Sequence, residues 1–460
     1  MTPDLERQRR IHLVGAGGAG MGAIAHVLHE MGHTVSGSDL KDSHVLDRLR
    51  VEGMVMEIGH AASNVGDAEL VAISTAIPDH NPEVQAARER GIPVLRRMDV
   101  LPAISAQRRT IVVAGTHGKT TTSSMLAMTL LEASLDPSFI IGGDVNEVGS
   151  GAVWSEGDWF VVEGDESDRT FLSLGAEIAV VTNVEPDHLE SYGGDAAHLH
   201  AAFVEFATGA ETRIYCADDA GARAVAADVP GITYGTAAEA DFRMVDVERH
   251  RSSIGFSIEH AGEPLCRVVL PTPGIHNARN ATAAVVAATV AGADADAAAR
   301  ALGRFGGVAR RFEFRGVADG VTFVDDYAHL PTEVDAALAA AQDGDWDRIV
   351  CVFQPHRYSR TAALWQDFGS AFGRADIVIV TDVYASGETP RPGVTGELIA
   401  DAVRAADPAA EVVWLPRLDE VASWLEFGLR PGDLCLTLGA GDLTGLPDQV
   451  LARLEERSNR

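Results

Sequence analysis

The sequence is poor in lysine, in cysteine and in long apolar runs. Of its 460 residues only Lys41 and Lys119 are lysines, so any site that needs a lysine has two candidates. Its four cysteines lie far apart without C-x-x-C spacing, which argues against a structural zinc site and favours a reducing cytoplasm. The most apolar stretch, 281–293, has about 13 residues, fewer than the ~20 needed to span a bilayer. The first residues run into a strand and a glycine turn rather than into a signal-peptide core.

Positive charge is also scarce. Lysine and arginine total 37 against 67 aspartates and glutamates, which gives a net charge of −30. Such a surface repels nucleic-acid backbones and anionic lipid, so we expect no nucleic-acid or membrane partner and a soluble, cytoplasmic protein. The chain is about three times as long as a typical ~150-residue domain, which predicts two to three domains.

Short β-rich runs alternate with helical patterns in three successive series, which predicts α/β domains built on largely parallel sheets. We place the domains at residues 1–107, 108–313 and 314–460. Within the second, residues 241–270 read as antiparallel strands. The third predicts a doubly wound sheet. The sequence does not specify the oligomeric state.

The first motif is a G-x-G-x-x-G pattern between a strand and a helix, formed by Gly15, Gly17 and Gly20. Such glycines let backbone N–H groups at a helix start approach a diphosphate. Asp39 ends the next strand, near the spacing of a ribose-binding acid. Taken alone, these features indicate an NAD-dependent dehydrogenase, although the same turn binds other diphosphate nucleosides. A glycine turn that serves packing alone stays open.

The second motif, Gly115-Thr-His-Gly-Lys-Thr-Thr121, also joins a strand to a helix. A phosphate loop needs backbone amides, a lysine for the phosphate charge and a hydroxyl for Mg²⁺, and Lys119 and Thr120 supply the last two. The loop is shorter than the standard pattern because Val113 stands where the first glycine would be. Even so, we interpret it as an ATP site.

Acidic residues follow the neighbouring strand in the run EGDESD. A Mg²⁺–nucleotide enzyme needs a carboxylate at the carboxyl edge of a strand beside the phosphate loop, which makes Glu163 a candidate metal ligand. His188 follows a further strand, but a lone histidine is more often structural. For the acidic run, solvated surface is the alternative.

Two further motifs lie towards the C-terminus. Asn277, at the start of a helix, is either an N-cap or an amide that faces an adenine ring. In the third domain, DDYAH and QPHRYSR follow successive strands, and Arg357 and Arg360 suit a bound carboxylate. A diphosphate turn, an ATP loop and a carboxylate site together fit an ATP-driven joining of two substrates. A nicotinamide-dependent dehydrogenase and a nucleotide-gated binding protein without turnover are the alternatives.

With these motifs in order, the sequence resembles the Mur ligases, and among them the alanine-adding (MurC) family. The matching stretches are GAGGAGM, STAIP, NPEV, AGTHGKTTT, EGDESDRTFL, TNVEPDHLESY, PGIHNARNA, GVARRFE, DDYAH, QPHRYSRT, PGVTGEL and GAGD. The resemblance implies a Rossmann-like N-terminal domain for a UDP sugar, a central P-loop ATPase domain and a Rossmann-like C-terminal domain for the amino acid. It implies an ATP- and Mg²⁺-dependent ligase that joins L-alanine to UDP-N-acetylmuramate through an acyl phosphate, in the peptidoglycan synthesis that supports cell-wall growth, shape and division.

The resemblance also implies roles for individual residues. Those at the UDP sugar are Gly15, Ala16, Gly17, Gly18, Ala19, Gly20, Asp39, Ser74 and Thr75. Those at ATP are Gly115, Thr116, His117, Gly118, Lys119, Thr120, Thr121, Asn277, Asn280, Arg311 and Asp326. Those at the amino acid are Tyr327, His329, Arg357 and Arg360. The metal ligands are Thr120, Glu163 and His188.

Three of these residues are expected to act in the chemistry. Lys119 offsets charge on the transferred phosphoryl group, His117 lies near the reacting carboxylate, and His329 accepts the proton of the incoming amine. One departure is Leu330, where the family usually has a second histidine before the proline. This leaves the preference among alanine, glycine and serine open.

Overall fold

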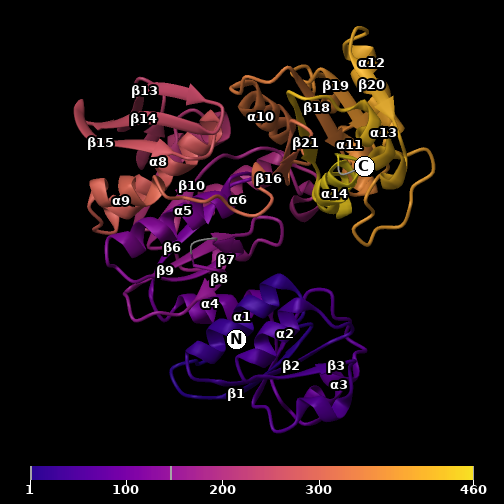
Figure 1. Ribbon diagram of the computed structural model, residues 1–460. Coiled ribbons are helices and arrows are strands. Elements are labelled where there is room, and N and C mark those ends of the chain that lie inside the picture. The colour runs from indigo at the N-terminus through magenta and orange to yellow at the C-terminus, as the bar shows by residue number, and fades with distance from the viewer. Residues whose placement is uncertain (1–2, 146–147, 459–460) are drawn as a thin grey trace. The chain divides into compact units, whose positions relative to one another are not determined.

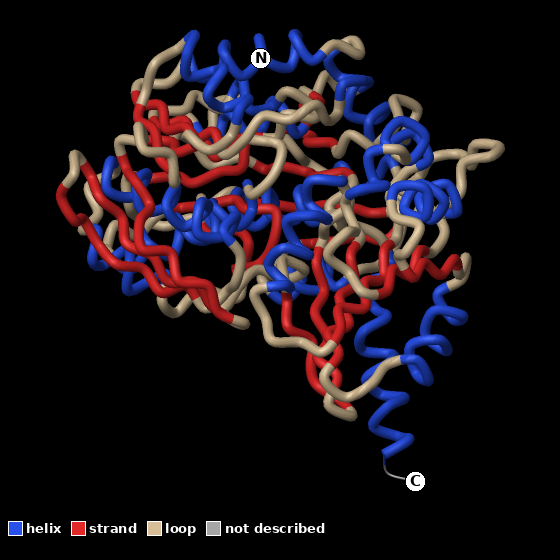
Figure 2. Tube along the Cα trace, turned by 90° about the horizontal axis from the view of Figure 1, so that it is seen from above, coloured by secondary structure: helices blue, strands red, loops and turns tan. Residues whose placement is uncertain are grey.

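The computed structural model describes residues 3–145 and 148–458. Their strands form three sheets, which follow one another along the chain from indigo to yellow in Figure 1. Helices flank these layers of strands (Figure 2). The residues group into two compact units: 1–246, 257–268 and 279–305 in the first, and 247–256, 269–278 and 306–460 in the second. The three domain boundaries expected from the sequence stay predictions.

The first sheet has five parallel strands in the order β3-β2-β1-β4-β5. The strands are β1 (Arg10–Val14), β2 (Thr34–Asp39), β3 (Val55–Ile58), β4 (Leu70–Ile73) and β5 (Val94–Arg96). The helices are α1 (Ala19–Glu30), α2 (His44–Val51), the 3₁₀ helix η1 (Ala62–Val65), α3 (Pro82–Glu89) and α4 (Arg97–Ser105). The strand order reverses beside β1, which is where doubly wound sheets bind their ligands.

The second sheet has ten strands in the order β15-β14-β13-β12-β11-β10-β6-β9-β7-β8. They are β6 (Arg109–Ala114), β7 (Ser138–Val145), β8 (Ser150–Val153), β9 (Trp159–Gly164), β10 (Ile178–Val181), β11 (Thr212–Cys216), β12 (Ile232–Gly235), β13 (Phe242–His250), β14 (Ser253–His260) and β15 (Glu263–Leu270). Its helices are α5 (Lys119–Glu132), η2 (Thr170–Ser173), η3 (Leu189–Tyr192), α6 (Ala196–Thr208), α7 (Ala220–Asp228), α8 (Ile275–Val290) and α9 (Ala295–Leu302). Because β6 lies between β9 and β10 and is parallel to both, the loops after all three leave the same edge.

The third sheet has six strands in the order β16-β17-β21-β18-β19-β20. They are β16 (Glu313–Ala318), β17 (Val321–Asp326), β18 (Arg348–Phe353), β19 (Ile377–Val380), β20 (Glu411–Trp414) and β21 (Asp433–Leu438). Its helices are α10 (Pro331–Gln342), α11 (Tyr358–Leu364), η4 (Asp367–Ser370), α12 (Glu397–Ala406), α13 (Leu418–Gly428), η5 (Asp442–Gly445) and α14 (Leu446–Ser458). Only the edge strand β16 pairs antiparallel among the pairs that the structure describes in this sheet, so the loops after β17, β18 and β21 share one edge.

Local sequence explains the elements that carry the site. The run Thr110–Ala114 of β6 is apolar without alternation and is buried throughout, as expected for a central strand of a parallel sheet covered on both faces. Helix α5 is buried on all sides over 121–130, so it forms part of the interior. The side chain of Asn81 accepts from two N–H groups of the first turn of α3, and Pro82 follows at its first position.

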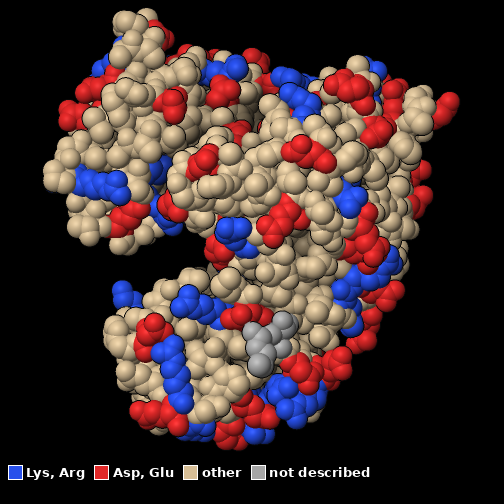
Figure 3. All heavy atoms as spheres, turned by 180° about the vertical axis from the view of Figure 1, so that it is seen from behind, with Lys and Arg blue, Asp and Glu red and all other residues tan. Residues whose placement is uncertain are grey.

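The predicted fold class, α/β with a Rossmann-like first sheet and a doubly wound third sheet, is confirmed by this architecture. The four cysteines are free and buried. Over the described ranges, no helix is long and apolar enough to cross a bilayer. On the face shown in Figure 3, arginines are interspersed with acidic side chains.

Candidate active site

The phosphate loop joins β6 to α5 as predicted. Gly115 has a φ of +141° and Gly118 a φ of +79°, a region that glycine enters without strain. A Cβ on Gly115 would stand 2.1 Å from Thr182 Oγ1, and one on Gly118 would stand 2.6 Å from Asn280 Oδ1. Both glycines are therefore required by backbone conformation and by space, and Asn280 lies against the loop.

The loop after β10 holds the phosphate loop in shape. The N–H of Thr116 donates to the carbonyl of Asn183 (3.2 Å), and the N–H of His117 donates to Asn183 Oδ1 (2.8 Å). The Thr182 hydroxyl (2.6 Å) and Asn183 Nδ2 (3.0 Å) both donate to the His117 carbonyl. These bonds between adjacent strand ends fix the loop before any phosphate is bound.

Lys119 is held at the start of α5 by oxygen atoms. Its Nζ donates to the carbonyls of Gly115 (2.5 Å) and Thr116 (3.1 Å) and lies 2.9 Å from Glu166 Oε2. Burial of Glu166, whose residue is 3% exposed, raises the pKa of its carboxyl group, and the charge of Lys119 opposes that rise. The ammonium is thus placed at the mouth of the loop by partners that an incoming phosphate can replace.

Two of the three predicted metal ligands lie together. The hydroxyl of Thr120 donates to Glu163 Oε2 at 3.1 Å, and the N–H of Gly142 donates to Glu163 Oε1 at 2.5 Å. A hydroxyl and a carboxylate beside a phosphate loop are the oxygen donors that Mg²⁺ prefers. This pair therefore fits a magnesium ion that completes its coordination with phosphate oxygens.

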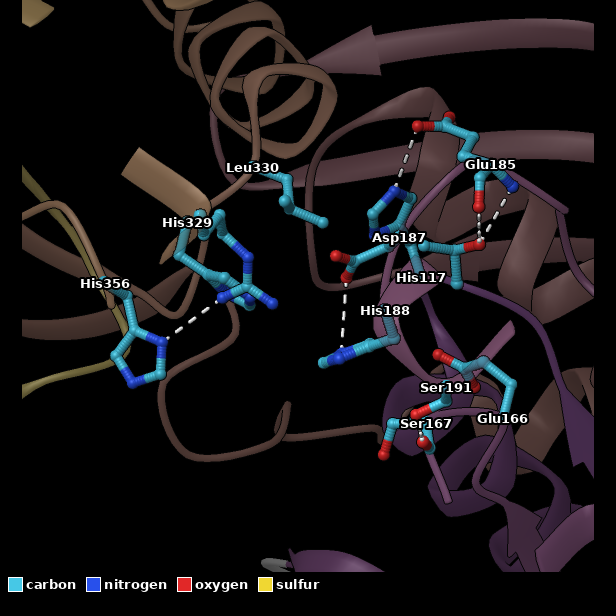
Figure 4. Close-up of polar contacts among 12 residues, drawn as sticks. His117, Glu166, Ser167, Glu185, Asp187, His188, Ser191, His329, Leu330 and His356 are labelled. Carbon is cyan, nitrogen blue, oxygen red and sulfur yellow. Dashed lines mark hydrogen bonds and ion pairs between the residues drawn. The ribbon is translucent and has the colours of Figure 1, made fainter. Parts of the chain in front are cut away.

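His188, the third predicted ligand, pairs with acids of its own loop. Its φ is +51°, and its Nε2 lies 3.4 Å from Asp187 Oδ2 (Figure 4). Its Nδ1 lies 3.5 Å from Glu190 Oε1. Within the described residues, no group of three or more His, Cys, Asp or Glu side chains is placed to hold a metal. His188 as a metal ligand stays a prediction.

In the glycine turn 15–20 of the first sheet, half of the backbone N–H groups donate to residues at the end of β2. The N–H groups of Gly15 and Ala16 both donate to the carbonyl of Ser38, and that of Gly17 donates to Asp39 Oδ2 at 2.9 Å. The remaining stretch, 18–20, is exposed at the start of α1. A diphosphate at this turn would therefore meet the amides of 18–20, rather than those of all six residues.

A buried carboxylate lies beneath this turn. Glu83 has no exposed surface and accepts hydrogen bonds from the Ser38 hydroxyl (2.6 Å) and Asn64 Nδ2 (2.6 Å). Burial raises its pKa, but hydrogen bonds from His12, Ser38 and neighbouring groups outweigh this and bring the pKa to about 2. Glu83 thus ties the end of β2 to the loop after β3 as a charged group.

Ser74 and Thr75, the other residues predicted at the sugar nucleotide, follow β4. The N–H of Ser74 donates to the carbonyl of Val14, and a Cβ on Gly15 would stand 2.9 Å from Ser74 Cβ. Ser74 therefore packs directly against the glycine turn. Thr75 is exposed at the same edge of the sheet.

In the third sheet, aromatic rings and histidines cluster after β17 and β18. The rings of Tyr327 and His329 meet edge to face with centroids 5.4 Å apart, and those of His329 and His356 are 5.6 Å apart. His329 Nδ1 lies 2.9 Å from the Tyr327 carbonyl. His356 stacks on Tyr384 on its other side. The predicted pair Tyr327 and His329 is thus brought together with His356, which lies in the predicted motif QPHRYSR, and with Tyr384, which was not predicted.

Arginines surround this cluster. An Nη atom of Arg360 donates to His356 Nδ1 at 3.2 Å (Figure 4). Burial, together with the charges of His329 and the two arginines, lowers the pKa of His356 to about 3, so the ring is neutral and accepts this bond. Arg357 has a φ of +69°, and its Nε is buried without a hydrogen-bond partner among the described residues. A guanidinium with a buried, unsatisfied N–H group suits a bound carboxylate.

Two residues predicted near the nucleotide, Arg311 and Asp326, have partners of their own. The guanidinium of Arg311 lies 4.9 Å from the Tyr327 ring centre. Asp326 accepts from the N–H groups of Phe312 (2.7 Å) and Ala328 (2.8 Å), and burial raises its pKa to about 6. Asp326 thus bonds the segment before β16 to the segment after β17. Its expected contact with ATP stays a prediction.

The N-cap reading of Asn277 is wrong. Helix α8 begins at Ile275, after Gly274 with a φ of +97°, so Asn277 lies inside the first turn. Its Nδ2 donates to the carbonyl of Pro273 at 2.8 Å. The side-chain amide thus bonds a carbonyl group of the segment that precedes the helix, rather than an N–H group of the first turn.

Comparisons with known proteins agree with this arrangement. Residues 10–109 match the model described as "Mur ligase family, catalytic domain", 113–288 the Mur ligase middle domain, and 310–441 the "Mur ligase, glutamate ligase domain". The chain therefore belongs to the Mur ligase family. Because these models span most of the chain, the nicotinamide-dependent dehydrogenase suggested by the glycine turn alone is not supported. That turn is shared by proteins that bind different diphosphate nucleosides.

Individual relatives narrow the comparison. The UDP-N-acetylmuramate–L-alanine ligase of Saccharopolyspora erythraea is 48% identical, covering 98% of this chain and 94% of that protein. The enzyme of the same name from Anaeromyxobacter is 43% identical over 98% of both chains. The crystal structure of UDP-N-acetylmuramate–alanine ligase from Thermotoga maritima superposes with a TM-score of 0.82 at 28% identity, covering 98% of this chain and 100% of that one.

Several residues that line the described loops were missed from the sequence. Asn183 and Glu185 bind the phosphate loop, and Arg310 places its guanidinium 4.8 Å from the Tyr327 ring centre. The signal that could have found the first two is their position after β10, next to the strand that leads into the phosphate loop. Arg310 precedes β16, and the rule that ligands bind at the carboxyl ends of parallel strands does not cover that position.

Proposed function

We propose that this protein joins L-alanine to the lactyl carboxylate of UDP-N-acetylmuramate and converts ATP to ADP and phosphate, in the cytoplasmic synthesis of peptidoglycan precursors. The observation that carries the proposal is a phosphate loop in which the carbonyls of Gly115 and Thr116 hold Lys119 and the Thr120 hydroxyl contacts Glu163. The chain that carries this loop is similar over nearly its whole length to ligases of that name. Lys119 is one of only two lysines, and it stands where the chemistry requires one.

The sugar nucleotide is assigned to the first sheet. Its diphosphate would accept hydrogen bonds from the exposed amides of 18–20 at the start of α1, where the helix dipole also favours negative charge. Ser74 and Thr75 lie at the same edge, after β4. The buried Glu83 network keeps the carbonyl of Ser38 in position to hold the turn.

ATP is assigned to the loop 115–121, with the β- and γ-phosphates beside Lys119. The Thr120 hydroxyl and Glu163 carboxylate would hold Mg²⁺, which would offset negative charge on the phosphate oxygens. Lys119 would exchange the carbonyls of Gly115 and Thr116 for phosphate oxygens. Glu166, buried against the ammonium, keeps that charge at the loop while phosphates enter and leave.

The first chemical step makes a poor electrophile reactive. An oxygen of the lactyl carboxylate attacks the γ-phosphorus of ATP, the bond from that phosphorus to the bridging oxygen breaks, and ADP leaves with the electron pair. Lys119 and the loop amides stabilise charge on the equatorial oxygens in the transition state. The product is an acyl phosphate, whose phosphate is a good leaving group.

In the second step the neutral amine of alanine attacks the acyl carbon. Phosphate leaves with the electron pair of the C–O bond, and the nitrogen loses a proton. We assign Arg357 and Arg360 to the alanine carboxylate, because guanidinium groups bind carboxylates bidentately, and we assign His329 as the base that accepts the amine proton. The neutral His356 keeps Arg360 oriented without adding a second positive charge.

A phosphate-release assay tests the proposal. We expect release only when UDP-N-acetylmuramate, ATP, Mg²⁺ and alanine are present together. Omission of any one should reduce release to background. Equal release without the sugar nucleotide would reject the ligase and favour a nucleotide-gated protein with plain ATPase activity.

A further inference from the structure

The helix that follows Arg357 is capped by a carboxylate from a different loop. Helix α11 begins directly after Arg357, and the side chain of this N-cap residue makes no capping hydrogen bond. Glu388, from the loop after β19, supplies the missing acceptor. The N–H of Ser359 donates to Glu388 Oε2 at 2.8 Å, and the Ser359 hydroxyl donates to Glu388 Oε1. The carboxylate thus bonds an N–H group of the first turn that has no partner within the helix.

The local sequence brings Glu388 to this helix. Strands β18 and β19 are parallel neighbours, so the loops that follow them leave the same edge of the third sheet. After β19, Ser386 and Gly387 have φ values of +47° and +84°, and the N–H of Glu388 donates to the carbonyl of Ala385 at 2.9 Å. Two successive left-handed residues make a tight turn. Glu388 therefore stands at the end of a turn whose main chain fixes its position.

The same loop also holds the main chain of Arg357. The N–H of Arg357 donates to the carbonyl of Tyr384 at 2.9 Å, and its carbonyl accepts from the N–H (3.0 Å) and the hydroxyl (2.9 Å) of Thr361. Its φ of +69° is one that residues other than glycine rarely adopt. Bonds on both sides therefore keep Arg357 in an uncommon conformation, and the contact between Ser359 and Glu388 closes the turn that follows it.

The cap uses the carboxylate of Glu388 and leaves the guanidinium of Arg357 for another anion. Burial raises the pKa of Glu388, but the bonds from Ser359 and the charges of Arg357 and Arg391 outweigh burial and lower it. Glu388 is therefore ionised at neutral pH, and both of its oxygens are bonded to Ser359. The buried Nε of Arg357 has no hydrogen-bond partner among the described residues. That N–H group can thus donate to a bound carboxylate.

We propose that Glu388 is a positioning residue of the ligase reaction, which fixes the start of α11 so that the guanidinium of Arg357 meets the carboxylate of the incoming amino acid. This inference rests on the proposed function. Glu388 does not itself touch the amino acid, because its oxygens are bonded to Ser359 and two carboxylates repel each other. Arg360 is also held by His356, so the effect is expected mainly at Arg357.

The test measures kcat and the KM for alanine, ATP and UDP-N-acetylmuramate by phosphate release. In Glu388→Ala we expect the KM for alanine to rise ~10–100-fold, the range for outer partners that orient a binding side chain. The kcat and the other two KM values should change less than ~3-fold, because the lost interaction concerns alanine alone. A merely structural role would instead reduce the amount of folded protein, which lowers kcat and leaves every KM unchanged.

Two further variants show how Glu388 acts. Glu388→Gln keeps an oxygen for the N–H of Ser359 and an amide group that the hydroxyl can bond, so its KM for alanine should stay within ~3-fold of the unmodified value. The double variant Glu388→Ala/Arg357→Ala should have a KM for alanine no higher than that of Arg357→Ala, because Glu388 acts through that arginine.

Glu420→Ala is the matched control. Glu420 lies in the first turn of α13 in the same sheet, and its Oε2 accepts from the N–H of Arg417 at 3.3 Å. Its removal takes the same kind of bond from a helix that carries none of the predicted amino-acid-binding residues, so the KM for alanine should not change. Melting temperatures check that each variant is folded. Ser359→Ala removes only the hydroxyl bond, should raise the KM for alanine less than Glu388→Ala does, and decides the test if Glu388→Ala is unfolded.

Three results would overturn the inference. The first is a KM for alanine within about twofold of the unmodified value in both Glu388→Ala and Ser359→Ala. The second is an equal rise in the KM for alanine in Glu420→Ala. The third is a double variant whose KM is raised by the product of the two single effects, which would mean that Glu388 acts independently of Arg357. Failure of the proposed function is a distinct result, because the unmodified protein would then release no phosphate from the complete mixture.

Discussion

Two glycine turns in this chain occupy equivalent positions, between a central parallel strand and a helix, and differ in the side chains that surround them. Each follows a central strand of a parallel sheet, β1 or β6, and each leads into a helix. The residue before each helix is a glycine, Gly18 or Gly118. Gly18 has an ordinary φ of −80° and open space around it, whereas Gly118 has a φ of +79° and lies against Asn280.

The side chains around the two turns differ more than the backbones do. The first turn contains no lysine and is bonded to the carbonyl of Ser38 in β2, whose hydroxyl donates to the buried carboxylate of Glu83. The second carries Lys119, a hydroxyl and two acids within reach. The backbone amides at a helix start can bind a diphosphate by themselves. Breaking a phosphate bond also needs charged side chains at that helix start.

Among the substitutions that test this difference between the turns, removal of Lys119 should have the largest effect on catalysis. Lys119→Ala takes away the cation that stabilises the transferred phosphoryl group, so we expect kcat to fall by at least ~10²–10³-fold. Steady-state phosphate release measures the loss, and the melting temperature should show that the fold is kept. A variant that retains a tenth of the activity would show that the second turn is, like the first, a binding site alone.

The hydrogen bonds of Glu83, which hold the end of β2 beside the first turn, should make the free energy of unfolding depend on pH. The folded pKa of Glu83, about 2, lies below the ordinary value of 4.5, so its contribution is present above pH 4.5 and is lost as the pH falls towards 2. The difference corresponds to roughly 3 kcal/mol of unfolding free energy. Denaturant unfolding of the unmodified protein and of Glu83→Gln at pH 7 and pH 3 measures it. Equal pH dependence in both would contradict the assignment.

The two helix-start glycines provide a matched pair of substitutions. Gly118→Ala should destabilise the protein by about 1–3 kcal/mol, because it combines a left-handed residue with a Cβ 2.6 Å from Asn280. Gly18→Ala should change the free energy of unfolding by less than about 0.5 kcal/mol, since its nearest neighbour would be 4.0 Å away. Thermal unfolding of both variants decides the matter, and equal losses would show that the two turns are not conformationally distinct.

The smallest effect is expected in amino-acid choice. Leu330 is buried, and its N–H donates to Glu333 Oε2 at 3.1 Å. Because one methyl group is worth only ~1–3 kcal/mol of discrimination, or ~10–200-fold, Leu330→His should change the ratio of alanine to glycine turnover by no more than that range. Phosphate release with alanine, glycine and serine measures this ratio for both proteins. A complete switch to serine would show that this position governs the pocket.

Much of the architecture follows from sequence pattern. Strand β9 is a buried apolar run that ends in polar residues, and helix α10 is an alanine-rich run that begins with a proline, so the local sequence accounts for both. Short strands such as β3 and β5 were not expected. They have four and three residues with mostly exposed or half-exposed side chains, so pairing with a neighbour, rather than local pattern, makes them strands.

The site could be predicted where its residues stand in a motif. Lys119, Thr120 and Glu163 are such residues, and they lie together. Their supporting partners could not be predicted, because Glu83 and Glu185 reach their partners only after separate loops meet at one edge of a sheet. The internal use of the Gly15–Gly17 amides is likewise a result of packing against β2, which no spacing rule contains.

The central claim is that the second turn activates a carboxylate by transferring a phosphoryl group to it. UDP-N-acetylmuramate labelled with ¹⁸O in both lactyl carboxylate oxygens tests this directly. The account predicts that each phosphate released during alanine addition carries one ¹⁸O atom, because the oxygen that attacked phosphorus departs with it. Unlabelled phosphate formed alongside the amide product would contradict the account.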